Sequence, residues 1–349
     1  MITIIIPTVS RPQMLRTALA SVAEQTAVDK IERVYVSENG GSRESEKVCA
    51  EFPTLPITYV FRVPMKPLEH AQVMHREFLT GEFTAYLHDD DWWAPSHLKN
   101  ALDTLESHPH AGAYAASHFT VTGESSHLGC SDNSFAWFGS NYSPLKSIWE
   151  LTRLNVLMAE LLNTMAHYST IVARTEILKK AAYVFDLGNP FDNDRMLIFA
   201  MSTFASIAYN PMPEAFIRNH PAQDCCSYKF KKIIKHQSET TRWLVESSGR
   251  SWEMVAACFA KRLALCPIES VPTLRALAVR QWSLPELFRN IKGPLEVNVE
   301  CLRKLRHIFE PMKARKSARR VKDPLSVPLV PEKNWINHTP TQTLELQAA

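Results

Sequence analysis

The sequence predicts an α/β fold built on a mostly parallel sheet with helices on both faces. Residues 2–6 form a continuous run rich in β-branched side chains, which is typical of a strand buried on both faces. The apolar residues of segment 11–25 then recur with helical spacing. Strand-like and helical segments alternate as far as residue 87, and this order predicts parallel strands joined by helices.

The elements are expected in the following order. Strands are predicted at 2–6, 33–37, 57–61 and 83–87, with helices at 11–25 and 69–79. Further on, strand character at 111–121 and 169–173 accompanies helical patterns at 151–166 and 193–204. Ligands bind at the carboxyl ends of strands in such sheets. The polar clusters that follow these strands are therefore the first candidates for a site.

The pattern changes near residue 225, and this change predicts the domain organisation. Residues 1–225 are expected to form the α/β domain, 226–323 a C-terminal helical appendage, and 324–349 an extended tail. The appendage begins with a helix expected at 229–247. Its segment 303–322 holds nine Lys or Arg residues against one acid.

Composition limits the class of protein. Hydrophobic residues make up 45% and charged residues 21%, as in ordinary globular proteins, and the net charge of +3 gives no indication of a nucleic-acid partner. Seven cysteines without a CxxC pair favour reduced thiols. No basic leader is evident, and the longest apolar stretch, 196–209, is too short to span a bilayer. We therefore expect a cytoplasmic protein.

The acidic run Asp89-Asp90-Asp91 follows the fourth predicted strand. Adjacent carboxylates repel and raise one another's pKa, and a divalent cation removes that penalty. Mn²⁺ or Mg²⁺ commonly binds one or two carboxylates together with substrate phosphates. The alternative is a solvated acidic turn before a helix. Trp92 and Trp93 directly follow the run and favour a partly dry cleft, so a metal–phosphate site is the preferred interpretation.

A second polar cluster, residues 7–12, follows the first strand. Ser10 could cap the following helix, with Pro12 in its first turn. The same turn could present Thr8, Arg11 and backbone N–H groups to an anion or a base. The two interpretations are compatible.

Several segments, in their order along the chain, together resemble glycosyltransferase family 2. They are Ile4-Ile5-Ile6-Pro7-Thr8, Arg11-Pro12, Val36-Ser37-Glu38-Asn39-Gly40, Gly81 to Asp91, Tyr168 to Arg174, Phe191-Asp192-Asn193-Asp194 and Ile217-Arg218-Asn219-His220. The resemblance covers about residues 1–225. It implies a GT-A fold, a nucleotide-sugar donor and inversion at the anomeric carbon.

The resemblance also implies roles for individual residues. The donor would be bound by Pro7, Thr8, Arg11, Glu38, Asp89 and Asp90. Asp91 would bind Mn²⁺ or Mg²⁺, and His220 would reach the diphosphate or the metal. Asp194 would be the catalytic base.

The residues themselves allow this division of labour. A metal stabilises charge on a departing diphosphate, and a carboxylate that takes the acceptor's proton suits a single inverting displacement. Asp192 is a rival base, because only one of two residues so spaced on a helix should face the cleft. Either aspartate could instead be a helix N-terminal acid favoured by the dipole.

Some positions depart from the family pattern. His88 stands where the family commonly has an acid, and we expect it to be packed or hydrogen-bonded rather than a ligand. Glu38-Asn39 replaces the usual Asp pair, and Met65-Lys66-Pro67-Leu68 replaces an Asn-x-Gly element. These departures leave base and donor recognition open.

The acceptor side rests on weaker signals. Trp92, Trp93 and Trp137 could stack on an acceptor sugar, or Trp137 could anchor the loop at 122–145 to the core. The basic segment 303–322 could contact an anionic membrane surface, which would suit a lipid-linked acceptor. A solvated helix face is the alternative.

Three functions remain in competition. The first is a metal-dependent hexosyltransferase that uses a nucleotide sugar, with a UDP-sugar expected, on a glycan or lipid-linked acceptor in bacterial surface polysaccharide synthesis. The second is a metal-dependent phosphoryl-transfer or hydrolytic enzyme. The third is a non-catalytic partner that binds a nucleotide or a glycan.

Overall fold

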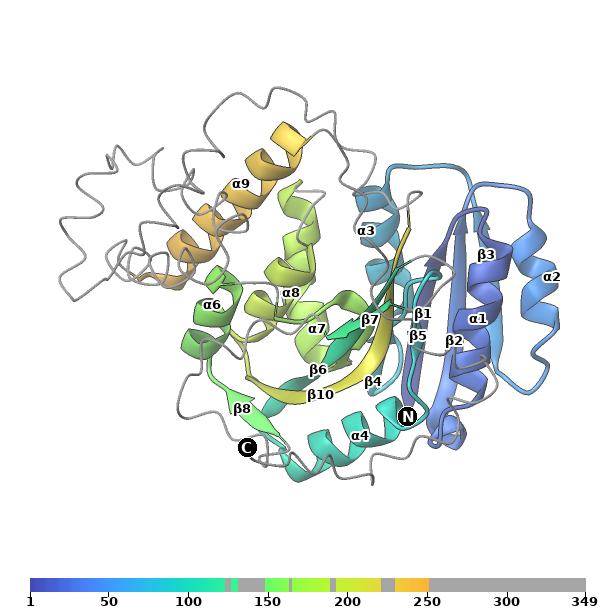
Figure 1. Cartoon of the computed structure of the whole chain (residues 1–349), viewed down its shortest axis with the longest axis horizontal. Coiled ribbons are helices and arrows are strands. Elements are labelled where there is room, and N and C mark those ends of the chain that lie inside the picture. The colour runs from blue at the N-terminus through green and yellow to red at the C-terminus, as the bar shows by residue number, and fades with distance from the viewer. Residues whose placement is uncertain (123–126, 131–147, 163–164, 189–192, 221–229, 251–349) are drawn as a thin grey trace, which may run out of the picture.

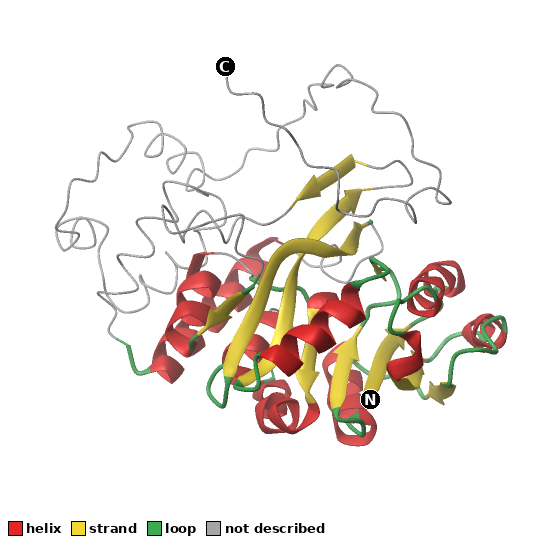
Figure 2. Cartoon of the chain, turned by 90° about the horizontal axis from the view of Figure 1, so that it is seen from below, coloured by secondary structure: helices red, strands yellow, loops and turns green. Residues whose placement is uncertain are grey.

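One curled sheet forms the centre of the molecule, with helices on both faces (Figures 1 and 2). The computed structural model describes residues 1–122, 127–130, 148–162, 165–188, 193–220 and 230–250. In sheet order the strands of the main path are β3-β2-β1-β4-β9-β6-β10-β5. The α/β class that the sequence predicts is therefore confirmed.

The first half of the chain is the parallel part of this sheet. It contains β1 (Ile2–Thr8), β2 (Ile31–Asn39), β3 (Ile57–Arg62) and β4 (Phe83–Tyr86), which pair in parallel around β1. The helices between them are α1 (Pro12–Ala23), α2 (Glu44–Ala50) and α3 (Pro67–Phe78), and a 3₁₀ turn η1 (Val28–Lys30) precedes β2. All four predicted strands are present.

The second half is mixed in direction. Its strands are β5 (Trp92–Trp93), β6 (Ala111–Thr122), β7 (His127–Cys130), β8 (Trp149–Leu151), β9 (Ile171–Arg174) and β10 (Ser206–Asn219). Its helices are α4 (His97–Ser107), α6 (Arg153–Leu162), α7 (Thr175–Ala181), α8 (Asn193–Met201) and α9 (Phe230–Ser248), with 3₁₀ turns η3 (Tyr168–Thr170) and η4 (Ala182–Leu187). Strand β9 runs antiparallel to both β4 and β6, while β10 runs parallel to β6.

Strand β10 differs most from the sequence expectation, since no predicted strand covers the length of Ser206–Asn219. Pro211 and Pro213 argue against a regular strand, because proline cannot donate to the ladder. The structure accommodates them with register shifts between Asn210 and Ala215. The strand therefore continues to Asn219 and brings its carboxyl end beside the acidic run.

The start of α1 also differs from expectation. Pro12 is in the first turn, as predicted, but Ser10 does not cap the helix. Ser10 has a φ of 51° and lies outside the helix, and Arg11 occupies the N-cap position without a side-chain cap bond. The turn after β1 is thus shaped by a left-handed residue, which is uncommon for a residue other than glycine.

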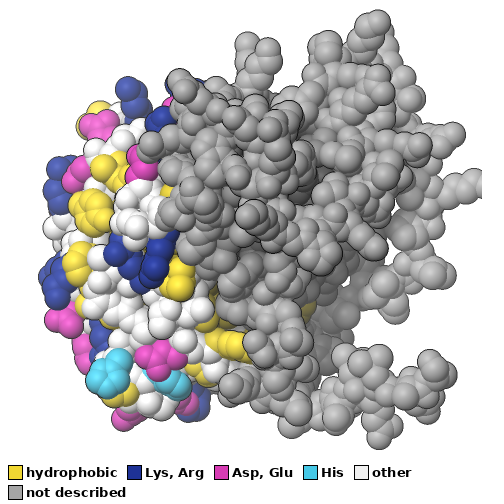
Figure 3. All heavy atoms as spheres, turned by 90° about the vertical axis from the view of Figure 1, so that its left-hand side faces the viewer, with side chains coloured by type: hydrophobic (Ala, Val, Ile, Leu, Met, Phe, Trp, Pro, Cys, Tyr) yellow, Lys and Arg dark blue, Asp and Glu magenta, His cyan; other side chains and the backbone are white. Residues whose placement is uncertain are grey.

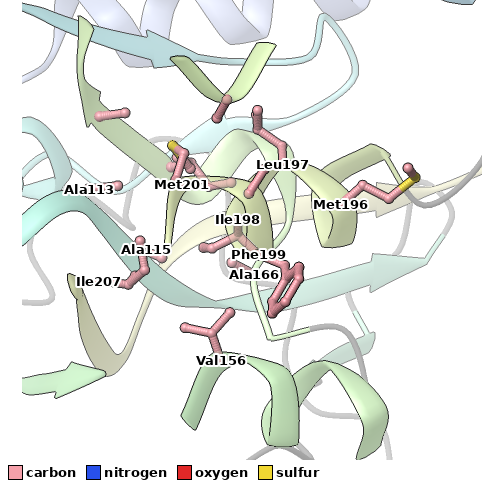
Figure 4. Close-up of a cluster of buried hydrophobic side chains, with 14 of the residues drawn as sticks. Ala113, Ala115, Val156, Ala166, Met196, Leu197, Ile198, Phe199, Met201 and Ile207 are labelled. Atoms are coloured by element: carbon pink, nitrogen blue, oxygen red, sulfur yellow. The ribbon is translucent and has the colours of Figure 1, made fainter. Parts of the chain in front are cut away.

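Alternate residues of the strands face two separate cores. Ile4 and Ile6 pack with α1, α2 and α4, whereas Ile5 packs with α3, α6, α7 and α8. Helix α8 is apolar on all sides, since Met196 to Met201 are all buried. Figure 4 shows its residues Ile198 and Phe199 among Ala115, Ile207 and Val156.

The C-terminal predictions are tested only in part. Helix α9 coincides with the helix expected at 229–247. The basic segment 303–322 and the tail 324–349 lie outside the described residues, so the domain boundaries stay predictions. Of the helices described, none is long and apolar enough to cross a membrane. On the face in Figure 3, the visible basic and acidic side chains are interspersed rather than gathered by sign.

Candidate active site

A pocket of about 530 Å³ opens at the carboxyl ends of β1, β2 and β4. Helix α3, the turns η3 and η4 and the first residues of α8 complete its walls. Seven residues proposed from the sequence or its family resemblance line it: Pro7, Thr8, Arg11, Asp89, Asp90, Asp91 and Asp194. The structure thus brings the two polar clusters together, as the parallel sheet predicted.

The acidic run is buried rather than solvated. Asp89, Asp90 and Asp91 are only 3%, 7% and 1% exposed. The N–H of Asp91 donates to the carbonyl of His88, so the run forms a tight turn directly after β4. Burial of three adjacent carboxyl groups excludes the solvated acidic turn that the sequence left open.

Asp89 faces the turn after β1. The hydroxyl of Thr8 donates to its Oδ2 at 2.7 Å, and Arg11 Nη1 lies 3.2 Å from its Oδ1. Burial and the charge of Asp90 raise the pKa of Asp89 to about 6, while Arg11 and Thr8 oppose this increase. Arg11 also contacts Asp90 Oδ2 at 3.2 Å, so one guanidinium joins two acids.

Asp90 pairs with His220 at the end of β10. His220 Nε2 lies 2.9 Å from Asp90 Oδ2. Burial opposes ionisation of Asp90, but His88, His220 and Arg11 outweigh it and lower its pKa. His220 was expected at the metal or the diphosphate. In this structure His220 is hydrogen-bonded to Asp90, the neighbour of the metal candidate Asp91.

Asp91 is the most deeply buried of the three acids. Its Oδ2 accepts the hydroxyl of Ser169 at 2.6 Å, and its Oδ1 accepts the backbone N–H of Arg218 at 3.0 Å. Burial and the charge of Asp90 raise the pKa of Asp91 to about 7. Turn η3 and strand β10 therefore both hold this carboxylate in place.

Two histidines complete a set of metal-ligand groups around Asp91. His88, Asp91 and His167 each offer one ligand atom, and these atoms lie within 4.8 Å of one another. His167 Nδ1 is 3.6 Å from Asp91 Oδ2. Two imidazole nitrogens and one carboxylate suit Mn²⁺ or a similar transition metal better than Mg²⁺, which prefers oxygen ligands. The residues present therefore fit a divalent transition metal.

The expectation that His88 is packed is confirmed, while its place among possible metal ligands is a new observation. Its ring stacks on Tyr168 with 5.7 Å between centroids, so it is packed. It also belongs to the three-residue group around Asp91. His167 was missed altogether, because it follows Asp91 by 76 positions and only the long-range fold brings the two together.

The pocket floor was not predicted from the sequence. Leu68, Ala71 and Met74 of α3 line it, together with the rings of His75 and Phe185. His75 Nδ1 donates to the carbonyl of Ala71, and burial lowers its pKa to about 4, so its Nε2 is free to accept the Tyr86 hydroxyl at 2.5 Å. The helical spacing of α3 signalled only a core-facing side.

The family model for glycosyl transferase family 2 matches residues 3–143, which include the first four strands and the acidic run. This part of the chain is similar to that family. His167, Asp194 and His220 lie beyond the matched residues. No curated protein sequence matches the chain.

Solved structures share the fold. S. aureus TarS 1–349 in complex with UDP-GlcNAc superposes with a TM-score of 0.55 at 15% identity, covering 75% of this chain and 71% of TarS 1–349. Another structure of TarS 1–349 gives 0.50 at 15% identity, covering 80% and 91%. The mannosyltransferase PcManGT from Pyrobaculum calidifontis, in complex with GDP-Man and Mn²⁺, gives 0.49 at 16%, covering 89% and 81%. The TarS structures confirm the GT-A fold.

The start of α8 lines the same pocket as the acidic run. Asp194 and Asn193 both line the pocket, and Asp194 Oδ1 accepts the N–H of Arg195 at 2.9 Å. The Oδ1 atom of Asn193 is buried without a partner among the described residues. Asp192, the rival base, and Trp137 lie outside the described residues.

Glu38, a predicted donor contact, does not line the pocket in this structure. Its carboxylate is fully buried behind the turn after β1, where it accepts the Tyr59 hydroxyl at 2.5 Å and the N–H of Ser10 at 3.4 Å. The neighbouring Asn39 lines the pocket instead and exchanges two hydrogen bonds with the backbone of Met65. The structure thus makes Glu38 a support of the turn.

The prediction that Trp93 contacts an acceptor is wrong. Its side chain is fully buried in the core, and its indole N–H donates to the carbonyl of Ser169 at 2.6 Å. Trp92 is half-buried between the ring of Phe216, at 5.2 Å, and the guanidinium of Arg218, at 4.8 Å. Neither indole lines the pocket, although Asp91 directly before them does.

Proposed function

We propose that the chain is an inverting, metal-dependent glycosyltransferase. It would move a sugar, a hexose in our expectation, from a nucleotide-diphosphate donor to a hydroxyl of a glycan or lipid-linked acceptor. One observation carries this proposal: the buried acidic run of a family 2 domain and the carboxylate of Asp194 line the same pocket. A donor and an attacking hydroxyl could therefore meet between them.

The donor half of the pocket suits a nucleotide diphosphate. Arg11 presents a guanidinium at the end of β1, where an anionic group can be bound, and Thr8 lies beside it in the pocket wall. TarS, which shares the fold, has been crystallised with UDP-GlcNAc, and this supports a uridine donor here. Asp89 would hold Thr8 and Arg11 in position, since it bonds both.

The metal half of the proposal rests on the group around Asp91. His88, Asp91 and His167 would hold a divalent ion, with Mn²⁺ favoured over Mg²⁺ by the two imidazoles. When bound, the ion would supply positive charge to stabilise the departing diphosphate. His220 would keep Asp90 oriented through their hydrogen bond rather than bind the ion itself.

The acceptor half assigns the proton transfer to Asp194. Its carboxylate would accept the proton of the attacking hydroxyl, as a general base must. A single displacement assisted by one base inverts the anomeric centre. Asp192 stays the alternative base. Cytoplasmic location, membrane contact through 303–322 and a role in surface polysaccharide synthesis complete the proposal and rest on sequence pattern.

A panel of nucleotide sugars tests the function. Thermal shift with and without Mn²⁺ identifies the donor, because a ligand that binds only the native state raises the apparent stability. Transfer to an acceptor panel is then measured for the wild type, for Asp91→Ala and for the exposed control Asp103→Ala on α4. We expect Mn²⁺-dependent donor binding and transfer that Asp91→Ala abolishes and Asp103→Ala retains.

Two outcomes would contradict the proposal. Phosphate release without an acceptor, and no sugar transfer with one, would indicate a phosphoryl-transfer or hydrolytic enzyme. Donor binding without turnover across a broad acceptor panel would indicate a non-catalytic partner. Unchanged turnover in Asp91→Ala would show that Asp91 does not bind an essential metal, but it would leave the proposed sugar transfer in place.

A further inference from the structure

We infer that Glu160 and Arg195 are positioning residues. They hold the segment that carries the proposed metal ligand His167 in a fixed position relative to the helix start that carries the proposed base Asp194. Neither Glu160 nor Arg195 was singled out by the sequence, and neither lines the pocket. The inference rests on the proposed function, because the residues they position, His167 and Asp194, have their roles from it.

The two side chains form a buried ion pair between helices α6 and α8. Glu160 is 0% exposed and Arg195 is 4% exposed. Arg195 Nε donates to Glu160 Oε2 at 3.0 Å, and a second guanidinium nitrogen donates to the backbone carbonyl of Glu160. The other carboxylate oxygen, Oε1, accepts the N–H of Met165 at 3.0 Å. The carboxylate thus has a partner on both oxygens.

These contacts tie together two segments that enter the site from different parts of the chain. Met165 lies two residues before His167, and the same segment continues to Ser169, which bonds Asp91. Arg195 directly follows Asp194, whose carboxylate accepts the Arg195 N–H. One carboxylate therefore sets the position of the metal-ligand segment relative to the proposed base.

Stability alone does not account for a buried pair at this place. Taking two charges out of water is costly, and well-packed apolar residues of similar volume often replace such a pair without loss of stability. The rest of α8 is apolar on all sides (Figure 4). The hydrophobic effect is non-directional, so burial of apolar surface does not by itself select one rotation or one height of the helix. The directional bonds of Arg195 remove that freedom at the end of α8 where Asp194 lies.

The charge of Asp194 also acts on the pKa of Glu160 and on the pKa of His167. Burial raises the pKa of Glu160 to about 7, Arg195 opposes this, and the charge of Asp194 adds to the increase. The same charge of Asp194 raises the pKa of His167 against the effect of burial. Asp194, Glu160 and His167 therefore lie within electrostatic reach of one another.

The experiment replaces the pair with two apolar residues, Glu160→Met with Arg195→Met, in the full chain. We expect a melting temperature within a few degrees of the wild type and a donor KM within about threefold, but a kcat at least tenfold lower. Mn²⁺ affinity, measured by electron paramagnetic resonance, should fall at least threefold, because His167 loses its anchor. The matched control Arg16→Met with Glu51→Met removes an exposed ion pair between α1 and the end of α2. This control should change neither kcat nor Mn²⁺ affinity.

A folded double variant with unchanged kcat and unchanged Mn²⁺ affinity would overturn the inference. If the double variant does not fold, Glu160→Gln takes its place. Glutamine keeps the shape and still accepts the Met165 N–H, but it removes the charge that pairs with Arg195. The criterion for this variant is therefore kcat alone, and an unchanged kcat would overturn the inference. If the wild type binds Mn²⁺ but transfers no sugar, the proposed function has failed. Mn²⁺ affinity in the variants then decides the positioning role by itself.

Discussion

The hydroxyl of Ser169 donates to Asp91 Oδ2 at 2.6 Å and accepts the backbone N–H of His88 at 3.0 Å. Ser169 on η3 thus joins Asp91, the last acid of the run, to His88, which directly precedes the run. This bond stabilises the ionised form of Asp91 and opposes the increase of its pKa by burial. The metal-ligand carboxylate therefore depends on a residue outside the acidic run.

Replacing Ser169 with alanine should weaken metal binding. Without the hydroxyl, the pKa of Asp91 rises further, and loss of one hydrogen bond to a charged group lowers Mn²⁺ affinity at pH 7 about tenfold. Isothermal titration calorimetry measures the change. Ser202→Ala is the matched control, because that buried hydroxyl donates to the carbonyl of Phe199 within its own helix turn, away from the acidic run. Equal affinities in both variants would show that the Ser169 bond has no role in metal binding.

Metal affinity should depend on pH through Asp91. Its pKa of about 7 means that protons compete with the ion, so Mn²⁺ affinity should fall as the pH drops from 8 to 6. Burial lowers the pKa of His167, so proton competition at this ligand is shifted to lower pH. In the metal-free protein, the raised pKa contributes stability that is fully present below the ordinary value of 3.8 and is lost as the pH rises through about 7. Calorimetry of Mn²⁺ binding across this range checks the sign, and an affinity that is flat from pH 6 to 8 would contradict it.

Asp194→Asn should lower kcat by about 10²–10⁴-fold, the usual contribution of a general base. Donor affinity should stay within about threefold, since the donor half of the pocket is untouched. The comparison is Asp192→Asn, with the exposed Asp186→Asn as control. Steady-state kinetics on all three decides between the two bases. Full activity in Asp194→Asn with loss in Asp192→Asn would reassign the role.

The two tryptophans should behave differently. Trp93→Ala empties a fully buried site and removes a hydrogen bond to Ser169, so it should cost about 3–5 kcal/mol of unfolding free energy. Trp92→Ala should cost about 1 kcal/mol, because it removes a half-buried ring stack and a cation–π contact. Urea unfolding measures both. A stable Trp93→Ala variant with a raised acceptor KM would restore Trp93 to the acceptor site.

Gly41 should control the turn that carries Arg11. Its φ is +106°, and a Cβ there would lie 2.3 Å from Ser10 Oγ and 3.0 Å from Glu38 Oε1. Gly41→Ala should therefore displace the turn after β1 and weaken donor binding severalfold. Gly188→Ala is the matched control, since its φ is +74° but no atom lies within 4 Å of the added Cβ. Gly188→Ala should lose about 1 kcal/mol of stability through its positive φ alone, and Gly41→Ala should lose more because the clash adds to it. Only Gly41→Ala should lose donor affinity.

Much of the first half of the fold could be read from local pattern. The run at 2–6 and the helical spacing of 11–25 place β1 and α1 correctly, because a strand buried on both faces and an amphipathic helix each leave a periodic signature. The acidic run could also be found from the sequence, because its three residues are neighbours in the chain.

Other features depend on partners far away in the sequence. The burial of Glu38 beneath Ser10 depends on Tyr59, and the burial of Trp93 depends on Ser169. Strand β10 continues past two prolines because β6 pairs with it on both sides of the register shifts. No local periodicity records such pairings.

The sequence by itself determined the parallel α/β half, the turn after β1 and a cluster of three carboxylates at the end of β4. Only the tertiary structure decided which groups surround those carboxylates. Strand β9 inserts antiparallel between β4 and β6, and η3 precedes it, so His167 and Ser169 reach Asp91. Strand β10 brings Arg218 to the same acid and His220 to Asp90. The physical reason is that the strand order is determined by how the two cores pack against the sheet. The strand order in turn determines which side chains from distant parts of the sequence come into contact.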